Sequence, residues 1–336
     1  MAIMDRGPSI REWFFGDGAW RDIARDAYRA LRGTPHQRPT RWGVSSVRIF
    51  KPRITARTWL RMGRPDGRVP IYNYFNRNPA PLDQGYSVRV THCRDYLGGQ
   101  QTYDGHLGTD FACVIGTPIV TPAPGVVLRV ATDMGYGGLK VCIDHGEGLF
   151  TTANHLSRCA VTVGQTLGRG QEIGLSGASG MEFVLCFPWV SPHLHFNAWL
   201  NGEAVDPYAM ADEISLWRRR NDPVPWNGAP VAGDEDFRPS RWSAPGVAAA
   251  IAACRDPALR ARALAFDDLP SRAAEILLIR SYAASACDDF GPLYERRHER
   301  RPRLDLPFRA EDYCGAVHPN DRRYGLKLAF PVKSKV

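Results

Sequence analysis

The sequence predicts an α+β protein, in which a mainly antiparallel β core lies between a basic N-terminal region and a helical C-terminal region. Short runs of β-forming residues separated by glycine-rich turns fill residues 86–212, and this spacing is typical of antiparallel strands. Residues 1–85 are rich in arginine, proline and aromatic residues and contain one helical repeat. Residues 213–336 contain helical segments that start near prolines, followed by an irregular basic tail. We therefore expect three regions with these boundaries.

The N-terminal region contains one clear helical pattern, over residues 18–32. Its apolar side chains recur at helical spacing, at Trp20, Ile23, Ala24, Ala27 and Leu31. Asp17 is placed to cap the start of this helix and Gly33 to end it. Further along the chain, the aromatic stretch 71–76 fits either the lining of a groove or ordinary buried packing.

The β-rich segment and the C-terminal region divide into short elements. We expect strands over residues 87–91, 118–120, 125–131, 139–144, 148–154, 173–176 and 193–200. We expect helices over about 245–254, 257–265 and 270–286. Asp256 and Asp268 are suited to cap the second and third of these helices. From about residue 291 to the end we expect irregular, basic chain.

The composition is that of an ordinary globular protein, with 44% apolar and 23% charged residues. No apolar run reaches the roughly 18 residues that a membrane-spanning helix needs. The net charge of +8 is uneven, because residues 1–85 carry +9 and residues 86–212 carry −5. The basic ends fit either a solvated surface or adhesion to anionic wall or membrane polymers. No nucleic-acid-binding motif is present, so we expect no nucleic acid partner; the oligomeric state stays open.

Cysteine usage and the N-terminus bear on where the protein works. The eight cysteines are scattered and include no CxxC pair, which argues against a zinc ribbon and favours free thiols. Charged residues interrupt every apolar stretch near the N-terminus, so we expect no secretory signal peptide.

One aspartate and five histidines occur in order along the β-rich segment: His106, Asp110, His145, His155, His193 and His195. Because side chains alternate along a strand, His193 and His195 project from one face, and an extended segment would also put His106 and Asp110 on one face. If two such strands meet, imidazole, carboxylate and imidazole can hold one cation. Three protein ligands with one open position are the pattern of a catalytic zinc site. The helix-borne HExxH motif is absent.

The motifs gain specificity from the glycine and proline landmarks between them, at residues 116–127, 135–138, 141–146, 154–156, 163–165, 170–174 and 191–196. Over about residues 100–210 the series resembles the lysostaphin- and LytM-type zinc metallopeptidases, which cut stem peptides and cross-bridges in bacterial peptidoglycan. The resemblance implies a zinc ion bound by His106, Asp110 and His195. It also implies that His155 and His193 are catalytic without binding the metal, one taking the proton of the attacking water and the other stabilising the oxyanion. His145 then has no metal role.

The sequence departs from the family pattern at three places. Ala153 stands where the family often has a tyrosine, and Asn197 where it often has a glutamate. Residues 181–191 form a longer loop than usual and carry Phe183, Phe187 and Trp189. This loop fits either a roof over the substrate groove or a hairpin that packs on the core.

Three functions are compatible with these observations. The leading one is an active zinc endopeptidase on peptidoglycan, because all three ligands and both catalytic histidines are present. The second is a non-catalytic relative that binds the wall or regulates a hydrolase, and the third is a peptidase of another small or Gly-rich peptide. A wall hydrolase acts in the periplasm or outside the cell, so the missing signal peptide leaves non-classical export or cytoplasmic residence.

Overall fold

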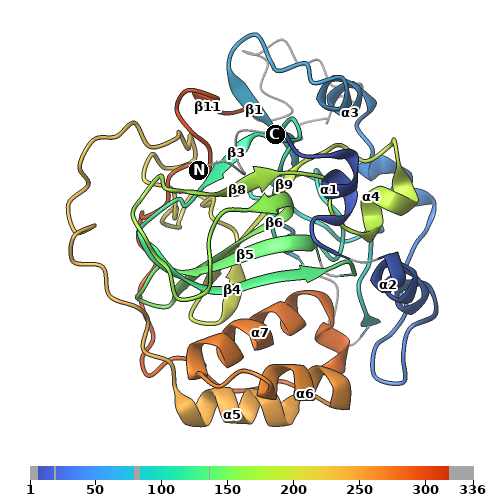
Figure 1. The fold of residues 1–336 in the computed structure, drawn as a ribbon, viewed down its shortest axis with the longest axis vertical. Helices are drawn as coiled ribbons and strands as arrows, with labels where there is room; N and C mark the ends of the chain where they lie inside the picture. Colours follow the sequence, from blue (N-terminus) through green and yellow to red (C-terminus); the bar gives the residue numbers. More distant parts are fainter. Residues whose placement is uncertain (1–6, 19, 79–83, 136, 318–336) are drawn as a thin grey trace.

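The computed structural model describes residues 7–18, 20–78, 84–135 and 137–317, and its centre is an eleven-stranded sheet (Figure 1). The strands along its hydrogen-bonded path are β11 (Gly315–Val317), β1 (Arg68–Asn73), β2 (Thr109–Phe111), β9 (Leu194–Leu200), β6 (Leu149–Cys159), β5 (Gly138–Asp144), β4 (Gly125–Asp133) and β7 (Thr166–Leu167). Off this path, β10 (Glu203–Val205) pairs with β9, and β8 (Glu172–Ser176) pairs with β3 (Pro118–Val120) and β6. Among these described pairs, β1 with β11 is parallel and the rest are antiparallel. The predicted α+β class is confirmed.

Strand β5 is buried along its whole length, which explains its apolar run Val141, Cys142 and Ile143. Along β5, Val141 and Ile143 belong to the main core, whereas Cys142 between them packs in a second core with Phe150 and Trp199. This alternation is the period of two that a strand imposes on its side chains. The sheet therefore separates two apolar layers.

The second layer is covered by the C-terminal helices α5 (Ala244–Ala253), α6 (Pro257–Leu264) and α7 (Leu269–Tyr282), which lie together beside β4 in Figure 1. A short 3₁₀ turn (Ala284–Ala286) follows. Asp256 and Asp268 cap α6 and α7 with their carboxylates, as expected. None of the helices in the described ranges is both long and apolar enough to cross a membrane.

Short helices from the N-terminal region gather near another edge of the sheet (Figure 1). They are α1 (Ile10–Phe15), α2 (Trp20–Arg32), a 3₁₀ turn (Val44–Ile49) and α3 (Pro52–Trp59). The prediction of α2 is confirmed with a start two residues later, but Asp17 is not its cap. The carboxylate of Asp17 instead accepts the hydroxyl hydrogen of Thr132 on β4. The expected apolar face is only partly covered, because Ile23 is buried and Leu31 is exposed.

Two sequence-based expectations about segments are wrong. Residues 87–91 form no strand, because the carboxylate of Asp104 accepts hydrogen bonds from the backbone of Thr91 and His92 and from the hydroxyls of Ser87 and Thr91. The region after residue 291 is not wholly irregular, since β11 pairs with β1. The last part of the predicted tail, residues 318–336, lies outside the described residues.

The other expected strands and helices are present, and most of their ends shift by one or two residues. However, β6 ends at Cys159, five residues later than expected, and α7 ends at Tyr282, four residues earlier than expected. Residues 71–76 are buried. All eight cysteines have free thiols. The division into three regions stays a prediction. We note that β1 and β11, from the first and last of those regions, both pair into the central sheet.

Candidate metal and catalytic centre

The register of four neighbouring strands brings the polar residues of the centre into one row. Asn73 on β1 lies opposite Asp110 on β2, and Asp110 lies opposite His195 on β9. His195 in turn lies opposite Asn154 on β6. The Cβ atoms of cross-strand partners lie only about 4.5–5.5 Å apart, so this pairing alone brings these side chains close together.

Three donor atoms converge at this row. His106 Nε2 lies 3.0 Å from Asp110 Oδ1 and 3.1 Å from His195 Nδ1, and the last two atoms lie 2.7 Å apart. All three residues are buried. His106 lies in the turn before β2, whereas Asp110 lies on the strand itself. That turn still directs its ring at Asp110.

The donor set fits a zinc ion. His106 Nδ1 donates a hydrogen bond to the carbonyl oxygen of Tyr74 at 2.5 Å, which leaves the lone pair of Nε2 facing the other donors. Asn73 Nδ2 donates to Asp110 Oδ2 at 2.7 Å and so turns Oδ1 toward the site. Two imidazole nitrogens and one carboxylate oxygen are the ligands that catalytic zinc prefers.

The protonation states also suit a cation. Burial opposes ionisation of Asp110, but the surrounding His106, His193 and His195 hold the pKa of its carboxyl well below the usual range. Burial lowers the pKa of His195 to about 4, against the opposing charge of Asp110. At neutral pH the site therefore offers a carboxylate and a neutral imidazole.

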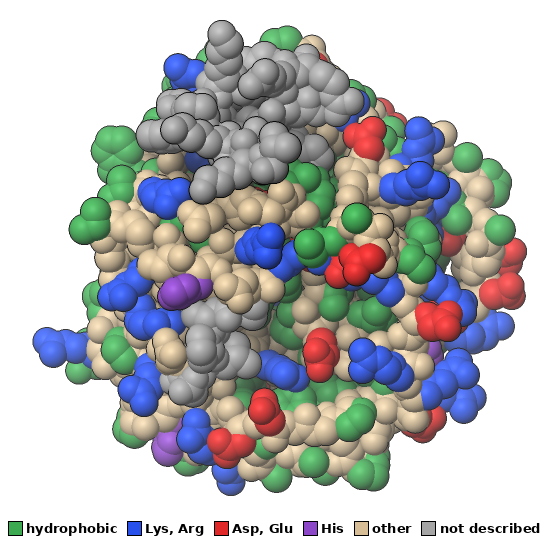
Figure 2. All heavy atoms as spheres, turned by 180° about the vertical axis from the view of Figure 1, so that it is seen from behind, with side chains coloured by type: hydrophobic (Ala, Val, Ile, Leu, Met, Phe, Trp, Pro, Cys, Tyr) green, Lys and Arg blue, Asp and Glu red, His purple; other side chains and the backbone are tan. Residues whose placement is uncertain are grey.

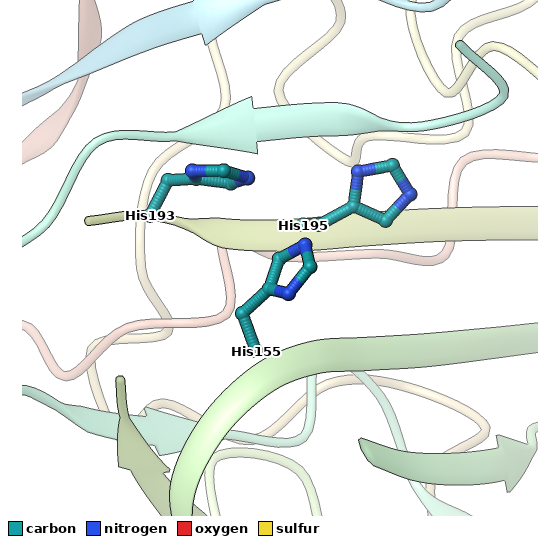
Figure 3. A group of neighbouring side chains, drawn as sticks. All are labelled: His155, His193 and His195. Atoms are coloured by element: carbon teal, nitrogen blue, oxygen red, sulfur yellow. The ribbon is translucent and has the colours of Figure 1, made fainter. Parts of the chain in front are cut away.

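Two further histidines stand beside these donors (Figure 3). The ring centroid of His155 lies 4.8 Å from that of His193 and 5.7 Å from that of His195. His155 sits at a β-bulge of β6 with φ of 62°, a left-handed conformation that costs about 1–3 kcal/mol in residues other than glycine. The bulge aims its ring away from the regular strand direction and toward His193 (Figure 3).

Hydrogen bonds separate the two possible donor sets. His155, His193 and His195 also form a group whose nitrogens lie within 4.8 Å of one another. However, His155 Nδ1 donates to the carbonyl of Ser179 at 2.7 Å, and its Nε2 lies 3.0 Å from a carboxylate oxygen of Glu182. With an acceptor at each nitrogen, His155 has no lone pair free for a metal, so the set that contains Asp110 is the better metal site.

Part of this chain matches a known protein family. The model of peptidase family M23 matches residues 104–207. We refer to this matched segment below as the M23 domain. All five predicted site residues lie within it.

Relatives of the M23 domain include wall enzymes. The chain is 42% identical over 111 residues to the peptidoglycan DD-endopeptidase ShyA of Vibrio cholerae, covering 33% of this chain and 24% of that protein. It is 40% identical over 105 residues to an uncharacterized metalloprotease of Haemophilus influenzae, covering 31% of this chain and 21% of that protein. The chain thus spans less than a quarter of the length of these two relatives.

Solved structures with similarity to this chain include a zinc-containing peptidase and an antimicrobial peptidase. One is a zinc-containing peptidase from Vibrio cholerae, with 30% identity, a TM-score of 0.28, and coverage of 40% of this chain and 35% of that one. Another is the catalytic domain of lysostaphin from Staphylococcus simulans, with 28% identity, a TM-score of 0.28, and coverage of 40% and 86%.

The inserted loop of the M23 domain supplies a residue that sequence reasoning missed. Residues 181–186 form the short helix α4 (Met181–Cys186), and Glu182 on it is the partner of His155 described above. Phe183 is buried, and its ring centroid lies 5.1 Å from the ring centroids of both His155 and His193. Phe187 and Trp189 are more than half exposed. The loop therefore both packs against the centre and borders it. The available sequence signal for Glu182 was a carboxylate directly after a glycine-rich turn.

The centre opens into a pocket of about 190 Å³. Asp110, His155, His193 and His195 line it, together with α4, α2 and the end of α7. The hydroxyls of Tyr86 and Tyr103, 2.9 Å apart, also belong to its wall. Three separate stretches of the chain thus shape the space in which a substrate would lie.

Other predicted positions have structural contacts. His145 lies outside both donor groups, and its ring nitrogens bond to the Pro124 carbonyl and the Thr151 hydroxyl, each at 2.8 Å. Ala153 is part of the main core. Asn197 Nδ2 donates to the carbonyl of Leu107 at 2.8 Å and so ties β9 to the turn that carries His106.

Proposed function

We propose that this chain is a zinc metallo-endopeptidase that hydrolyses peptide bonds in the stem peptides or cross-bridges of bacterial peptidoglycan. The observation that carries the proposal is the convergence of His106, Asp110 and His195 inside an M23 domain, next to two imidazoles that are not needed as ligands. A zinc ion held by these three residues would polarise the scissile carbonyl and acidify the attacking water.

We propose that His193 is the general base that takes the proton of the attacking water. Its Nδ1 donates to the carbonyl of Ser191 at 2.7 Å, so the neutral ring carries its lone pair on Nε2, 3.5 Å from Asp110 Oδ1. Burial lowers the pKa of His193, despite the opposing charge of Asp110, and so favours this neutral form. A neutral imidazole facing the donor cluster is suited to act as general base.

His155 is assigned the opposite role. Both of its nitrogens face acceptors, which requires a proton on each. Burial alone would lower the pKa of His155, but the charge and hydrogen bond of Glu182 raise it above the usual value. Two groups whose environments move their pKa values apart are typical of an acid and base pair. The positive charge of the His155 ring would stabilise the oxyanion, and the proton taken up by His193 would pass to the leaving amine.

The basic ends of the chain extend this proposal to the wall polymers. Residues 1–85 carry a net charge of +9, which favours adhesion to polyanions. Figure 2 shows lysine and arginine side chains spread among acidic ones over one face of the molecule. Because these charges are intermixed and form no basic patch on this face, we expect any attachment to be weak and salt-sensitive, which co-sedimentation with sacculi at rising ionic strength would measure.

A defined substrate pair tests the proposal. The zinc-loaded protein is incubated with a purified cross-linked muropeptide dimer and, separately, with a Gly-rich peptide, and the products are identified by mass spectrometry. Chelator-sensitive conversion of the dimer to monomers supports the proposal. Cleavage of the Gly-rich peptide alone would instead indicate a peptidase of another peptide. Binding to sacculi without cleavage of either substrate would indicate a non-catalytic relative.

A further inference from the structure

One wall of the catalytic pocket comes from outside the M23 domain, from α2 and the loop after it. Arg25, Asp26 and Arg29 of α2 line the pocket, and so do Gln37 and Arg38 of the loop. The loop is tied to the end of α7, because Gln37 Nε2 donates to the carbonyl of Tyr282 and the backbone N–H of Arg38 donates to the hydroxyl of Ser285. The backbone of this loop is therefore tied to the end of α7 beside the pocket.

Most charged groups around the pocket have a partner of opposite charge. Arg25 pairs with Asp22 at 2.8 Å and with Asp26 at 3.2 Å. Arg262 pairs with Asp133 at 2.8 Å and with Glu275. The remaining carboxylates of the pocket, Glu182 and Asp110, face histidines.

Arg29 and Arg38 differ from these residues. Both are exposed side chains that line the pocket. Among residues 7–18, 20–78, 84–135 and 137–317, no carboxylate lies within 4.0 Å of either guanidinium. Arg29 and Arg32 both lie in the last turn of α2, where a positive charge interacts favourably with the helix dipole. Arg32, however, is not part of the pocket wall. A helix-stabilising role therefore does not explain why Arg29 and Arg38 both border the pocket.

We propose that Arg29 and Arg38 form an anion-binding subsite that takes a carboxylate of the peptide substrate, at a position away from the scissile bond. The proposal rests on the function proposed above and narrows its substrate to peptides with a free carboxylate. A guanidinium is suited to this ligand, because its planar fork can donate two parallel hydrogen bonds to one carboxylate. Stem peptides of peptidoglycan carry free carboxylates, and no acidic partner of this chain competes for these two arginines in the described residues.

The test compares two peptides that differ in one group. The substrate is a short cross-linked peptide, made once with its free carboxylates and once with those carboxylates converted to amides. KM and kcat are measured for the wild-type chain, for the double variant Arg29→Gln and Arg38→Gln, and for the matched control Arg32→Gln. We expect the double variant to raise KM for the carboxylate peptide about tenfold, with a smaller change in kcat, because the contact is remote from the reacting bond. KM for the amidated peptide and all values for Arg32→Gln should stay close to wild type.

A binding measurement separates this subsite from the catalytic proposal. Calorimetry with zinc-loaded His193→Ala gives the Kd of each peptide, with and without the two arginine changes. A preference for the carboxylate peptide that disappears in the arginine double variant supports the subsite, even if no peptide is ever cleaved. Equal losses for both peptides, or an equal loss in Arg32→Gln, would overturn it while leaving cleavage untouched.

Discussion

Asp110 is the residue on which the proposed metal site depends most. Its Oδ1 lies 3.0 Å from His106 Nε2 and 2.7 Å from His195 Nδ1, while its Oδ2 accepts the hydrogen bond from Asn73. One carboxylate thus faces two imidazoles with one oxygen and is oriented by an amide through the other.

Removal of a proposed ligand should remove the metal. We expect wild-type protein to hold about one zinc per chain, and His106→Ala or Asp110→Ala to lose it, because two remaining ligands bind zinc weakly. Metal analysis of the dialysed proteins gives the stoichiometry. The matched control is His145→Ala, whose ring lies outside the donor groups and which should keep its zinc. Full zinc occupancy in the Asp110 variant would refute the ligand assignment.

The two remaining histidines should separate catalysis from coordination. His155→Ala and His193→Ala should keep zinc and lower kcat by about 10²–10⁴, the usual contribution of a positioned acid or base. Metal content and turnover are measured on the same preparations. If His193→Ala lost zinc and His195→Ala kept it, the roles of these two residues would be exchanged.

Glu182 offers a finer test of the charge on His155. Glu182→Gln keeps the shape of the side chain but removes the charge that raises the pKa of His155. We expect zinc to stay bound and kcat to fall, by less than in His155→Ala, because the amide can still accept a hydrogen bond from Nε2. Turnover measured against a common peptide decides the matter. A rise in kcat would mean that Glu182 obstructs the substrate rather than supporting His155.

At the scale of elements, the sequence pattern predicted the long strands of the sheet and missed its short strands and helices. The strands β4, β5 and β6 were predictable, because each is a run of β-forming residues bounded by glycine-rich turns. β2 was missed, because it is a three-residue strand preceded by a turn. α4 was missed for a similar reason, since its six residues are too few to show a helical period.

The helix α1 was missed although its start signal can be read from the sequence. Ser9 and Glu12 form a reciprocal capping box. Glu12 also pairs with Arg158 of β6 at 2.8 Å, which fastens α1 to the sheet. Six helical residues are too few to show a helical period, yet the capping box and the ion pair hold α1 in place on the sheet.

The ion pair of α1 gives the protein a pH-dependent contribution to stability. Burial alone would raise the pKa of Glu12, but hydrogen bonds from Ser9 and the interaction with Arg158 lower it from 4.5 to about 2. Because the folded pKa lies below the unfolded one, this contribution is present above pH 4.5 and is lost as the pH falls toward 2. We expect Glu12→Gln to lower the free energy of unfolding by about 1 kcal/mol near pH 6, a value reduced by partial solvent exposure, and by less at pH 3.

Denaturant unfolding of the metal-free wild type and variant at both pH values measures this difference. Glu203→Gln is the control, because Glu203 is exposed and has no ion pair in the described part of the chain. A difference between wild type and Glu12→Gln that stays constant from pH 6 to pH 3 would contradict the assigned pKa shift.

At the scale of the whole molecule, the pocket is a joint product of distant parts of the sequence. The grouping of His106, Asp110 and His195 could be predicted, because these residues occur in a fixed order between glycine landmarks. The pocket wall could not, because Arg29 and Arg38 carry no motif and reach the centre only through the packing of α2 and its loop beside α4 and α7. β1 supplies Asn73 to Asp110 in the same way. Long-range packing, not local pattern, completes the site.

Digestion of intact peptidoglycan sacculi tests the central claim most directly. The zinc-loaded full-length chain and its Asp110→Ala variant are incubated with sacculi, and the muropeptides released by subsequent muramidase treatment are quantified by mass spectrometry. We predict that wild-type protein converts cross-linked dimers to monomers and that the variant, or wild type with chelator, leaves the dimers intact. An unchanged dimer fraction after treatment with fully zinc-loaded wild-type protein would contradict the claim that this chain is a peptidoglycan endopeptidase.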